Sequence, residues 1–302
     1  MDMVAPVMDK VTWVEADILD ILALEEAMEG VEQVYHCAAL ISFDPKEVKK
    51  MMEVNQKGTE QVVNTALHCG IKKLVHVSSI AALGRNKNGS HLSEDSKWER
   101  SKHNSNYAIS KYLAEHEVWR GMAEGLDVAV VNPSVIIGSG RWDDGPLKMF
   151  KLVWKNFPFY PKGVSGFVDV RDVARYMILL MESDISGQRF ILNSINLSFK
   201  NFQERIAEEL DRKKPSILVN PIIQQIAWRL EWVRGLFMRN LNPLITRETA
   251  EHSSRIYYYE NEKSLKNFEF SYIPIEQTIK QTSKQFKEAS EDNFCSKYLP
   301  LH

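Results

Sequence analysis

Two residues of this 302-residue chain have the side chains and the spacing to transfer a proton together. Tyr107 and Lys111 are four positions apart, so on a helix they lie one turn apart on the same face. A tyrosine with an unperturbed pKa near ~10 exchanges protons poorly at neutral pH, and a neighbouring cation lowers that pKa. Tyrosine-lysine pairs are also common on exposed helices, so the interpretation depends on a third group.

Ser79 is that third group. With Ser78 it ends a β-branched segment, Lys73 to Ser78, which is typical of a strand. Open parallel sheets bind ligands at the carboxyl ends of their strands. A hydroxyl at that place can bind a carbonyl oxygen while a phenol protonates the developing alkoxide, as hydride transfer to a carbonyl requires. Alone, Ser79 would be explained as a strand-end cap; with the Tyr107–Lys111 pair it indicates an active site.

The elements that must position these residues alternate between short β-branched segments and longer helical ones. This alternation predicts an α/β fold, a Rossmann-like doubly wound parallel sheet. We expect strands at Val11 to Ala16, Val31 to Cys37, Lys73 to Ser78, Leu126 to Asn132 and Arg189 to Leu192. We expect helices from the cap Asp20 to Gly30, and at Pro45 to His68, Tyr107 to Glu124, Val170 to Met181 and Phe202 to Leu210.

The pattern loosens after Pro133, which indicates a second, smaller domain. We expect residues 1–136 and 167–194 to form the dinucleotide-binding domain, and residues 137–166 and 195–302 to form a substrate domain. Pro215 to Arg239 is rich in Ile, Trp and Leu but is interrupted by Glu231, which favours a core or lid helix over a membrane-surface helix. Arg141 and Trp142 are the first candidates for the substrate pocket.

Composition excludes several classes of partner. Lys and Arg number 38 against 40 Asp and Glu, so a net charge of -2 creates no field that attracts nucleic acid or an anionic membrane. No segment approaches the ~18 apolar residues of a membrane span. Cys37, Cys69 and Cys295 have no metal-ligand spacing and suit a reducing compartment. The sequence therefore predicts a cytoplasmic protein that binds a small molecule and no metal.

Seven segments, in order and spacing, resemble the extended short-chain dehydrogenases/reductases, the NAD-dependent epimerase/dehydratase family. The resemblance is strongest to dihydroflavonol-reductase-like and hydroxysteroid-dehydrogenase-like members and covers nearly the whole chain. The matching segments are Glu15 to Asp20, Tyr35 to Leu40, Asn55 to Thr59, His76 to Ile80, Tyr107 to Lys111, Asn132 to Gly138 and Phe167 to Asp172.

The resemblance assigns cofactor contacts to the first half of the chain. It implies that Asp17 and Ile18 lie beside the adenine ring, although a helix-entry acid and a core isoleucine would look the same. Ala38, Ala39 and Leu40 correspond to the strand end along which ribose and pyrophosphate lie; close strand packing would also favour alanine.

The resemblance also places contacts around the catalytic residues. Asn55 corresponds to an asparagine that holds the active-site backbone and a proton-relay water near the lysine, although a helical asparagine is usually just exposed. Pro133 and Val135 match the segment that orients the nicotinamide, where a proline can also be simple turn punctuation. Family members place the cofactor against residues matching Ser78, Tyr107 and Lys111, and often dimerise through the helices matching Pro45 to His68 and Tyr107 to Glu124.

One family feature is absent from the sequence. Members open with a strand, a G-x-x-G-x-x-G turn and a helix, because glycine lets backbone amides approach the cofactor's pyrophosphate. The first strand expected here matches the family's third. We expect truncation of an ordinary enzyme rather than natural loss of cofactor binding. The second family strand carries the residue that separates NAD from NADP, so either cofactor is compatible with the sequence.

Two neighbours of Ser79 narrow the chemistry. Ile80 stands where the family's dehydratases carry an acid, and Leu83 precedes Gly84 where sugar epimerases usually carry a tyrosine. The leading hypothesis is an NAD(P)-dependent oxidoreductase with a Ser79, Tyr107 and Lys111 triad. The alternatives are a nucleotide-sugar epimerase with the same triad and a non-catalytic dinucleotide-binding sensor or scaffold.

Overall fold

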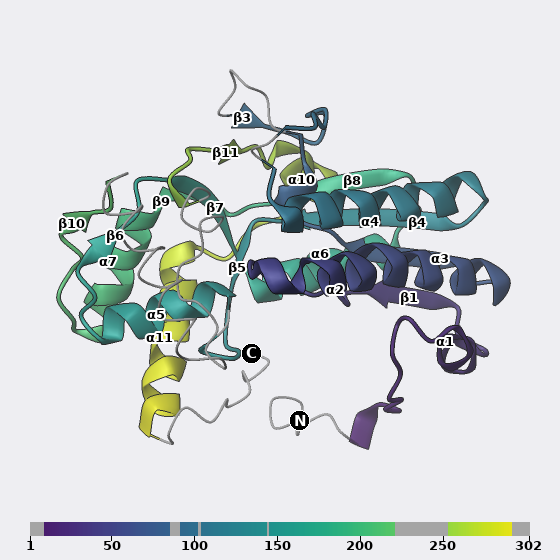
Figure 1. Cartoon of the computed structure of the whole chain (residues 1–302), viewed down its shortest axis with the longest axis horizontal. Helices are drawn as coiled ribbons and strands as arrows, with labels where there is room; N and C mark the ends of the chain where they lie inside the picture. Colours follow the sequence, from purple (N-terminus) through teal and green to yellow (C-terminus); the bar gives the residue numbers. More distant parts are fainter. Residues whose placement is uncertain (1–8, 85–90, 102–103, 144, 221–252, 292–302) are drawn as a thin grey trace.

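Four parallel strands form the central sheet of the computed structural model, which describes residues 9–84, 91–101, 104–143, 145–220 and 253–291 (Figure 1). The strands are β1 (Gln33–His36), β2 (Lys73–Val77), β4 (Asp127–Pro133) and β8 (Gln188–Leu192). They are hydrogen-bonded in the order β1-β2-β4-β8, and every pair is parallel. The predicted parallel α/β fold is confirmed.

Helices cover both faces of this sheet because side chains alternate along each strand. Leu74, Val128 and Val130 pack into one cluster with α3 (Gly58–His68) and α4 (Asn106–Ala123). The intervening side chains, Val75, Ala129 and Val131, pack on α6 (Val170–Glu182) from the other face. Figure 1 shows α3 and α4 side by side on their face of the sheet. Burial on both faces explains the continuous β-branched sequence of these strands.

The long helix predicted at Pro45 to His68 forms with an irregularity in its middle. It runs through η2 (Pro45–Glu47), α2 (Val48–Met52), a π-helical turn at Glu53–Lys57 and α3. Gly70 follows it with φ of 70°, a left-handed conformation that glycine adopts without strain. Single π turns inside helices occur frequently at functional sites, and this one carries Asn55.

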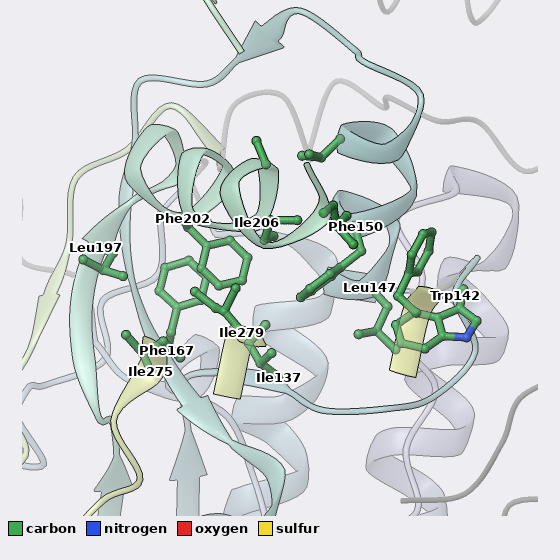
Figure 2. Packing of buried hydrophobic residues seen from close by; sticks show 14 of the residues in the cluster. Ile137, Trp142, Leu147, Phe150, Phe167, Leu197, Phe202, Ile206, Ile275 and Ile279 are labelled. Atoms are coloured by element: carbon green, nitrogen blue, oxygen red, sulfur yellow. The ribbon is translucent and has the colours of Figure 1, made fainter. Parts of the chain in front are cut away.

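A second layer is built on the strands β5 (Val135–Ile137), β7 (Val164–Asp169) and β9 (Ile195–Ser198). The helices α5 (Lys148–Trp154), α7 (Phe199–Leu210) and α11 (Ile275–Glu291) gather around it, away from α1 (Ile21–Met28) (Figure 1). Figure 2 shows its core, in which the rings of Phe167 and Phe202 stack 4.2 Å apart between centroids. Large aromatic burial gives this layer a core of its own.

Short elements connect these layers. They are the turns η4 (Ile80–Ala82) and η5 (Gly145–Leu147), the paired strands β3 (His91–Leu92) with β11 (Tyr258–Tyr259) and β6 (Phe159–Tyr160) with β10 (Ile217–Leu218), and the helix α10 (Glu262–Asn267). None of the described helices is long and apolar enough to cross a bilayer.

Two sequence predictions are wrong. Residues 11–16 form no strand, and Val11 and Val14 are 50% and 57% exposed; β-branched residues form a strand only where a partner strand accepts their hydrogen bonds. Trp142, expected at the substrate pocket, lies instead in the core of the second layer, 2% exposed, with its ring edge-on to Phe286. Most of the helix predicted at Pro215 to Arg239 lies outside the described residues.

Candidate active site

Ser79 and Tyr107 come together at the carboxyl end of β2. Ser79 caps the turn η4, where its Oγ accepts from the amide of Ala81 at 3.1 Å. Tyr107 lies in the first turn of α4, whose cap Ser105 accepts from the amide of Ala108 at 2.9 Å. Tyr107 lies close enough to Ser79 for the serine hydroxyl to lower the pKa of the phenol. The strand end and the helix start thus bring together two residues 28 positions apart in sequence.

Lys111 is buried beside them. Its side chain comes from the next turn of α4, the residue is 2% exposed, and its Nζ donates to the carbonyl oxygen of Val77 at 2.8 Å. Burial lowers the pKa of Lys111 to about 8, while the charges of Glu115 and Cys37 act in the opposite direction. The ammonium is therefore held at the end of β2 and titrates close to physiological pH.

The pKa of Tyr107 differs from the prediction. Burial raises it above its ordinary value, and the Ser79 hydroxyl only partly opposes that effect. We expected Lys111 to lower this pKa, but its ammonium is directed to the Val77 carbonyl oxygen. The phenol is thus protonated at neutral pH, which suits a proton donor better than a base.

Asn55 links the π turn to the end of β1. Its Oδ1 accepts from the amide of Leu40 at 2.7 Å, and its Nδ2 donates to the carbonyl oxygen of Leu40 and to Oγ of Ser110, both at 2.9 Å. Ser110 in turn donates to the carbonyl oxygen of Tyr107 at 2.8 Å. Asn55 is 1% exposed, so the exposed-helix explanation of this residue is wrong and its side chain holds the backbone on both sides of the site.

The other predicted cofactor residues are spread along the same edge. Ala38 and Ala39 follow β1 and are exposed. Asp17 is exposed, and its Oδ1 accepts from the amide of Leu19 at 3.0 Å. Ile18 packs against α3, where a Cβ on Gly58 would collide with it.

The remaining predicted residues lie at the ends of the inner strands. Pro133 ends β4 and is buried, and Val135 begins β5. Ser78 is 5% exposed, and its Oγ donates to Glu115 at 2.6 Å. The hydroxyl of Ser78 is therefore bound inside the protein and does not face an open surface.

These groups fit the nicotinamide-ribose half of a dinucleotide. The donor set contains an ammonium, a phenol and a hydroxyl, and the alanines after β1 leave a surface without bulky side chains. For the pyrophosphate, the printed sequence contains no G-x-x-G-x-x-G segment. Among the described residues, no group of three or more His, Cys, Asp or Glu side chains is arranged to hold a metal ion.

Two buried histidines lie beside Lys111 and were not predicted from the sequence. The rings of His36 and His76 are 4.9 Å apart between centroids, and Nε2 of His36 lies 2.9 Å from Oγ1 of Thr59. Burial, and secondarily the charge of Lys111, lowers the pKa of His36 to about 4 and that of His76 well below its ordinary value. Both rings are neutral at physiological pH.

Sequence reasoning also missed Glu115 and Asn132. The two side chains are joined by a bond of 2.9 Å between Nδ2 and Oε2, and both residues are buried. The spacing held a signal for Glu115, since positions 107, 111 and 115 follow one another at four-residue intervals on one helix face. Asn132 begins the matching segment Asn132 to Gly138, but its bond to Glu115 was not predictable because that partner lies on another element.

The chain is similar in sequence to proteins named as reductases. A petunia (Petunia hybrida) protein, cinnamoyl-CoA reductase 1, is 30% identical over 61% of this chain and 57% of its own length, so the chain spans little more than half of that relative. A second relative comes from Synechocystis sp., and its name assigns it provisionally as a dihydroflavonol 4-reductase. It is 26% identical to this chain over 89% of this chain and 80% of its own length.

A solved structure and a family model extend the comparison. The dTDP-glucose 4,6-dehydratase from Streptomyces venezuelae, solved with NAD bound, has a TM-score of 0.76 and 19% identity, covering 95% of this chain and 83% of that one. At this identity the likeness shows the fold. The model of the NAD-dependent epimerase/dehydratase family matches residues 4–193, and the chain therefore belongs to that family.

Proposed function

We propose that the protein is an NAD(P)-dependent oxidoreductase that reduces a small-molecule carbonyl, or oxidises the corresponding alcohol, with Ser79, Tyr107 and Lys111. The observation that supports this most is the buried Lys111 ammonium, bound to the Val77 carbonyl oxygen at the carboxyl end of a parallel strand, one helical turn from Tyr107 and Ser79. Few structural needs would place a phenol and a hydroxyl beside a buried ammonium at such a place.

Each residue has a chemical task in this proposal. The phenol of Tyr107 donates its proton to the substrate oxygen in reduction and takes it back in oxidation. The hydroxyl of Ser79 holds the same oxygen and fixes the direction of the phenol. The Lys111 ammonium binds the ribose of the cofactor, whose nicotinamide supplies the hydride when it is bound.

The residues around Ser79 favour oxidoreduction over sugar dehydration. Ile80 is 9% exposed and packs in a core cluster with Leu83, Leu92, Ile191 and Tyr259. The position that follows Ser79 therefore faces the interior and offers no acid or base to a substrate. Two relatives named as reductases support the same reaction class.

Three further features belong to this proposal. The layer around β5, β7 and β9 supplies the substrate side of the site, as the predicted domain division requires. The chain forms a dimer through α3 and α4. It works in the cytoplasm, where its dispersed cysteines stay reduced.

Replacement of Tyr107 by phenylalanine tests the function. Tyr107→Phe removes the proton donor and keeps the ring, so turnover of NADH or NADPH with a panel of aromatic aldehydes and ketones should fall by about 10²- to 10⁴-fold while cofactor binding persists. Tyr112→Phe is the matched control, because Tyr112 lies on the same helix, stacks on Trp98 at 4.2 Å and should keep normal turnover. Unchanged turnover in Tyr107→Phe, or a wild-type chain that binds neither nucleotide, would overturn the proposal.

A further inference from the structure

A buried carboxylate lies one helical turn beyond Lys111. Glu115 is 2% exposed, and no step of the chemistry proposed above uses it. Removing a carboxylate from water costs several kcal/mol unless other groups compensate its charge. The groups that bind Glu115 therefore indicate its role in the site.

Four donors bind this carboxylate from four elements. Oε2 accepts from Oγ of Ser78 at 2.6 Å and from Nδ2 of Asn132 at 2.9 Å. Oε1 accepts from Nη1 of Arg189 at 3.1 Å and from Nε1 of Trp119 at 3.2 Å. Trp119 belongs to α4 itself, whereas the others come from the end of β2, from β4 and from β8. One side chain thus ties the helix that carries Tyr107 to three strands.

The network fixes the backbone of Ser79 from both sides. Ser78, its neighbour, is bound to Glu115 directly. Asn132, also bound to Glu115, uses the same Nδ2 to donate to the carbonyl oxygen of Ser79 at 3.0 Å. Because Ser79 must stay within hydrogen-bond reach of Tyr107, a shift at Glu115 would move one member of the pair relative to the other.

Arg189 extends the network to the segment that follows β3. Its Nε donates to the carbonyl oxygen of Glu94 at 2.9 Å, and its Nη2 donates to that of Ser96 at 3.3 Å. The amide of Ile191 donates to Oε1 of Glu94 at 2.8 Å. The ion pair of Glu115 and Arg189 therefore also holds the connection that leads from Ser79 to α4.

Glu115 also contributes charge at the site. Its negative charge opposes the burial that lowers the pKa of Lys111. Several other groups act electrostatically on Lys111 or lie beside it: Cys37 and His36 from the β1 segment, His76 from β2, and Tyr107 from the same helix. Both histidines are neutral at physiological pH and burial keeps the Cys37 thiol protonated by raising its pKa. Glu115 is thus the main negative charge near the ammonium.

We propose that Glu115 is a positioning residue of the active site, which holds the Ser79 backbone in place relative to the helix that carries Tyr107 and Lys111. The inference rests on the proposed oxidoreductase function. It assigns Glu115 no contact with substrate or cofactor, and its effect reaches the reaction through Ser78, Asn132 and Lys111.

Glu115→Gln is the direct test. The amide keeps the size of the side chain but places an NH2 group against donors, and it removes the charge beside Lys111. We expect kcat in the reductive direction to fall at least about tenfold, as small misplacement of reacting groups does, with little change in KM for the cofactor. The decline of kcat at high pH should begin at lower pH than in the wild type, because Lys111 loses its proton more easily.

Two controls separate this role from general stability. Glu117→Gln removes a carboxylate of the same helix that pairs with Arg120 at 2.9 Å on the surface, and it should change neither kcat nor the pH profile. If Glu115→Gln does not fold, Ser78→Ala removes one of the four donors and should lower kcat several-fold, with the pH profile unshifted because the charge of Glu115 remains.

Parallel measurement of Tyr107→Phe distinguishes the two possible failures. Wild-type kcat in Tyr107→Phe would overturn the proposed function. Loss of turnover in Tyr107→Phe, together with wild-type kcat and pH profile in Glu115→Gln, would overturn this inference alone. If Glu115→Gln does not fold, wild-type kcat in Ser78→Ala would have the same meaning.

Discussion

The four-stranded sheet is more fully buried at β2, β4 and β8, called here the inner side, than at its edge strand β1 and the segment before it, called the outer side. On the inner side, Val128, Val130 and the other central residues of β4 are 0% exposed. On the outer side, Tyr35 of β1 is 44% exposed and the preceding segment, which includes Trp13, is half exposed. The residues proposed as catalytic belong to the inner side, whereas the residues predicted to contact adenine, ribose and pyrophosphate lie along the outer side.

This difference separates two requirements of the site. The relative position of Ser79, Tyr107 and Lys111 is fixed by β2, α4 and the Glu115 network, all of which are packed. The surface after β1 is open, and its conformation depends on Asn55 and on whatever covers the sheet there. Proton chemistry should thus depend on the core, and cofactor affinity on the outer side.

Truncating one aromatic residue on each side should give the largest contrast. Phe190→Ala empties a fully buried position of β8 and should lower the free energy of unfolding by about 3–5 kcal/mol. Tyr35→Ala removes a half-exposed ring of β1 and should change it by no more than about 0.5 kcal/mol. Denaturant titration measures both, and equal losses would show that the outer side is packed as tightly as the inner one.

Acid should destabilise the protein through the buried histidines His36 on β1 and His76 on β2. The pKa of His36 is about 4 in the folded state against 6.5 ordinarily, so the unfolded chain binds more protons as pH falls through this window. The free energy of unfolding should therefore decline from pH 6.5 toward pH 4, by up to about 3 kcal/mol for this residue.

Denaturant titration across this pH range tests the acid effect. His36→Gln should lose less stability on acidification than the wild type, although its stability at pH 7 falls as well. His116→Gln, at an exposed position of α4, serves as the control and should follow the wild-type curve. An identical pH dependence in His36→Gln and the wild type would contradict the assignment.

Titration of Lys111, on the inner side, should determine the pH above which reductive kcat falls. Lys111 has a pKa of about 8, and above it the ammonium that holds the cofactor ribose in place for hydride transfer is lost. Reductive kcat should fall with rising pH from about that value, approaching a tenfold loss per pH unit. Steady-state kinetics from pH 6 to 10 would detect this, and a flat profile would exclude Lys111 as the titrating group.

Helix capping on the outer side should have the smallest effect. Asp20→Ala removes the cap of α1, where Oδ1 accepts from the amides of Leu22 and Ala23 at 3.1 and 3.2 Å. We expect a loss of at most about 1 kcal/mol, because α1 covers the open side. The matched cap Ser198→Ala on the packed helix α7 should cost at least as much, and the reverse order would weaken the comparison.

The features that could be predicted from the sequence are those that depend on local residue patterns: strands, helix ends and residues that share a helix face. Lys73 to Ser78 and Leu126 to Asn132 were recognised because buried parallel strands are β-branched throughout. Asp20 and Gly30 marked both ends of α1 through capping and a positive φ of 71°. The four-residue spacing of Tyr107 and Lys111 put both on one face of α4.

The failures come from contacts between distant parts of the chain. Val11 to Ala16 has strand composition, yet strand formation depends on a partner that composition does not reveal. The pKa of Tyr107 follows burial and the direction of the Lys111 ammonium, neither of which appears in a four-residue spacing. The four-residue spacing puts Glu115 on the face of Tyr107 and Lys111, but the convergence of Ser78, Asn132 and Arg189 on it involves distant parts of the chain.

Deuterium transfer tests the central claim most directly. The wild-type protein and Tyr107→Phe would be incubated with reduced nicotinamide cofactor that carries deuterium at both C4 positions and with an aromatic aldehyde, and the alcohol formed would be analysed by mass spectrometry. We predict that the wild type places one deuterium on the former carbonyl carbon and that Tyr107→Phe forms at least about a hundredfold less labelled product. Equal labelled product from both proteins, or an unlabelled alcohol from the wild type, would contradict the account.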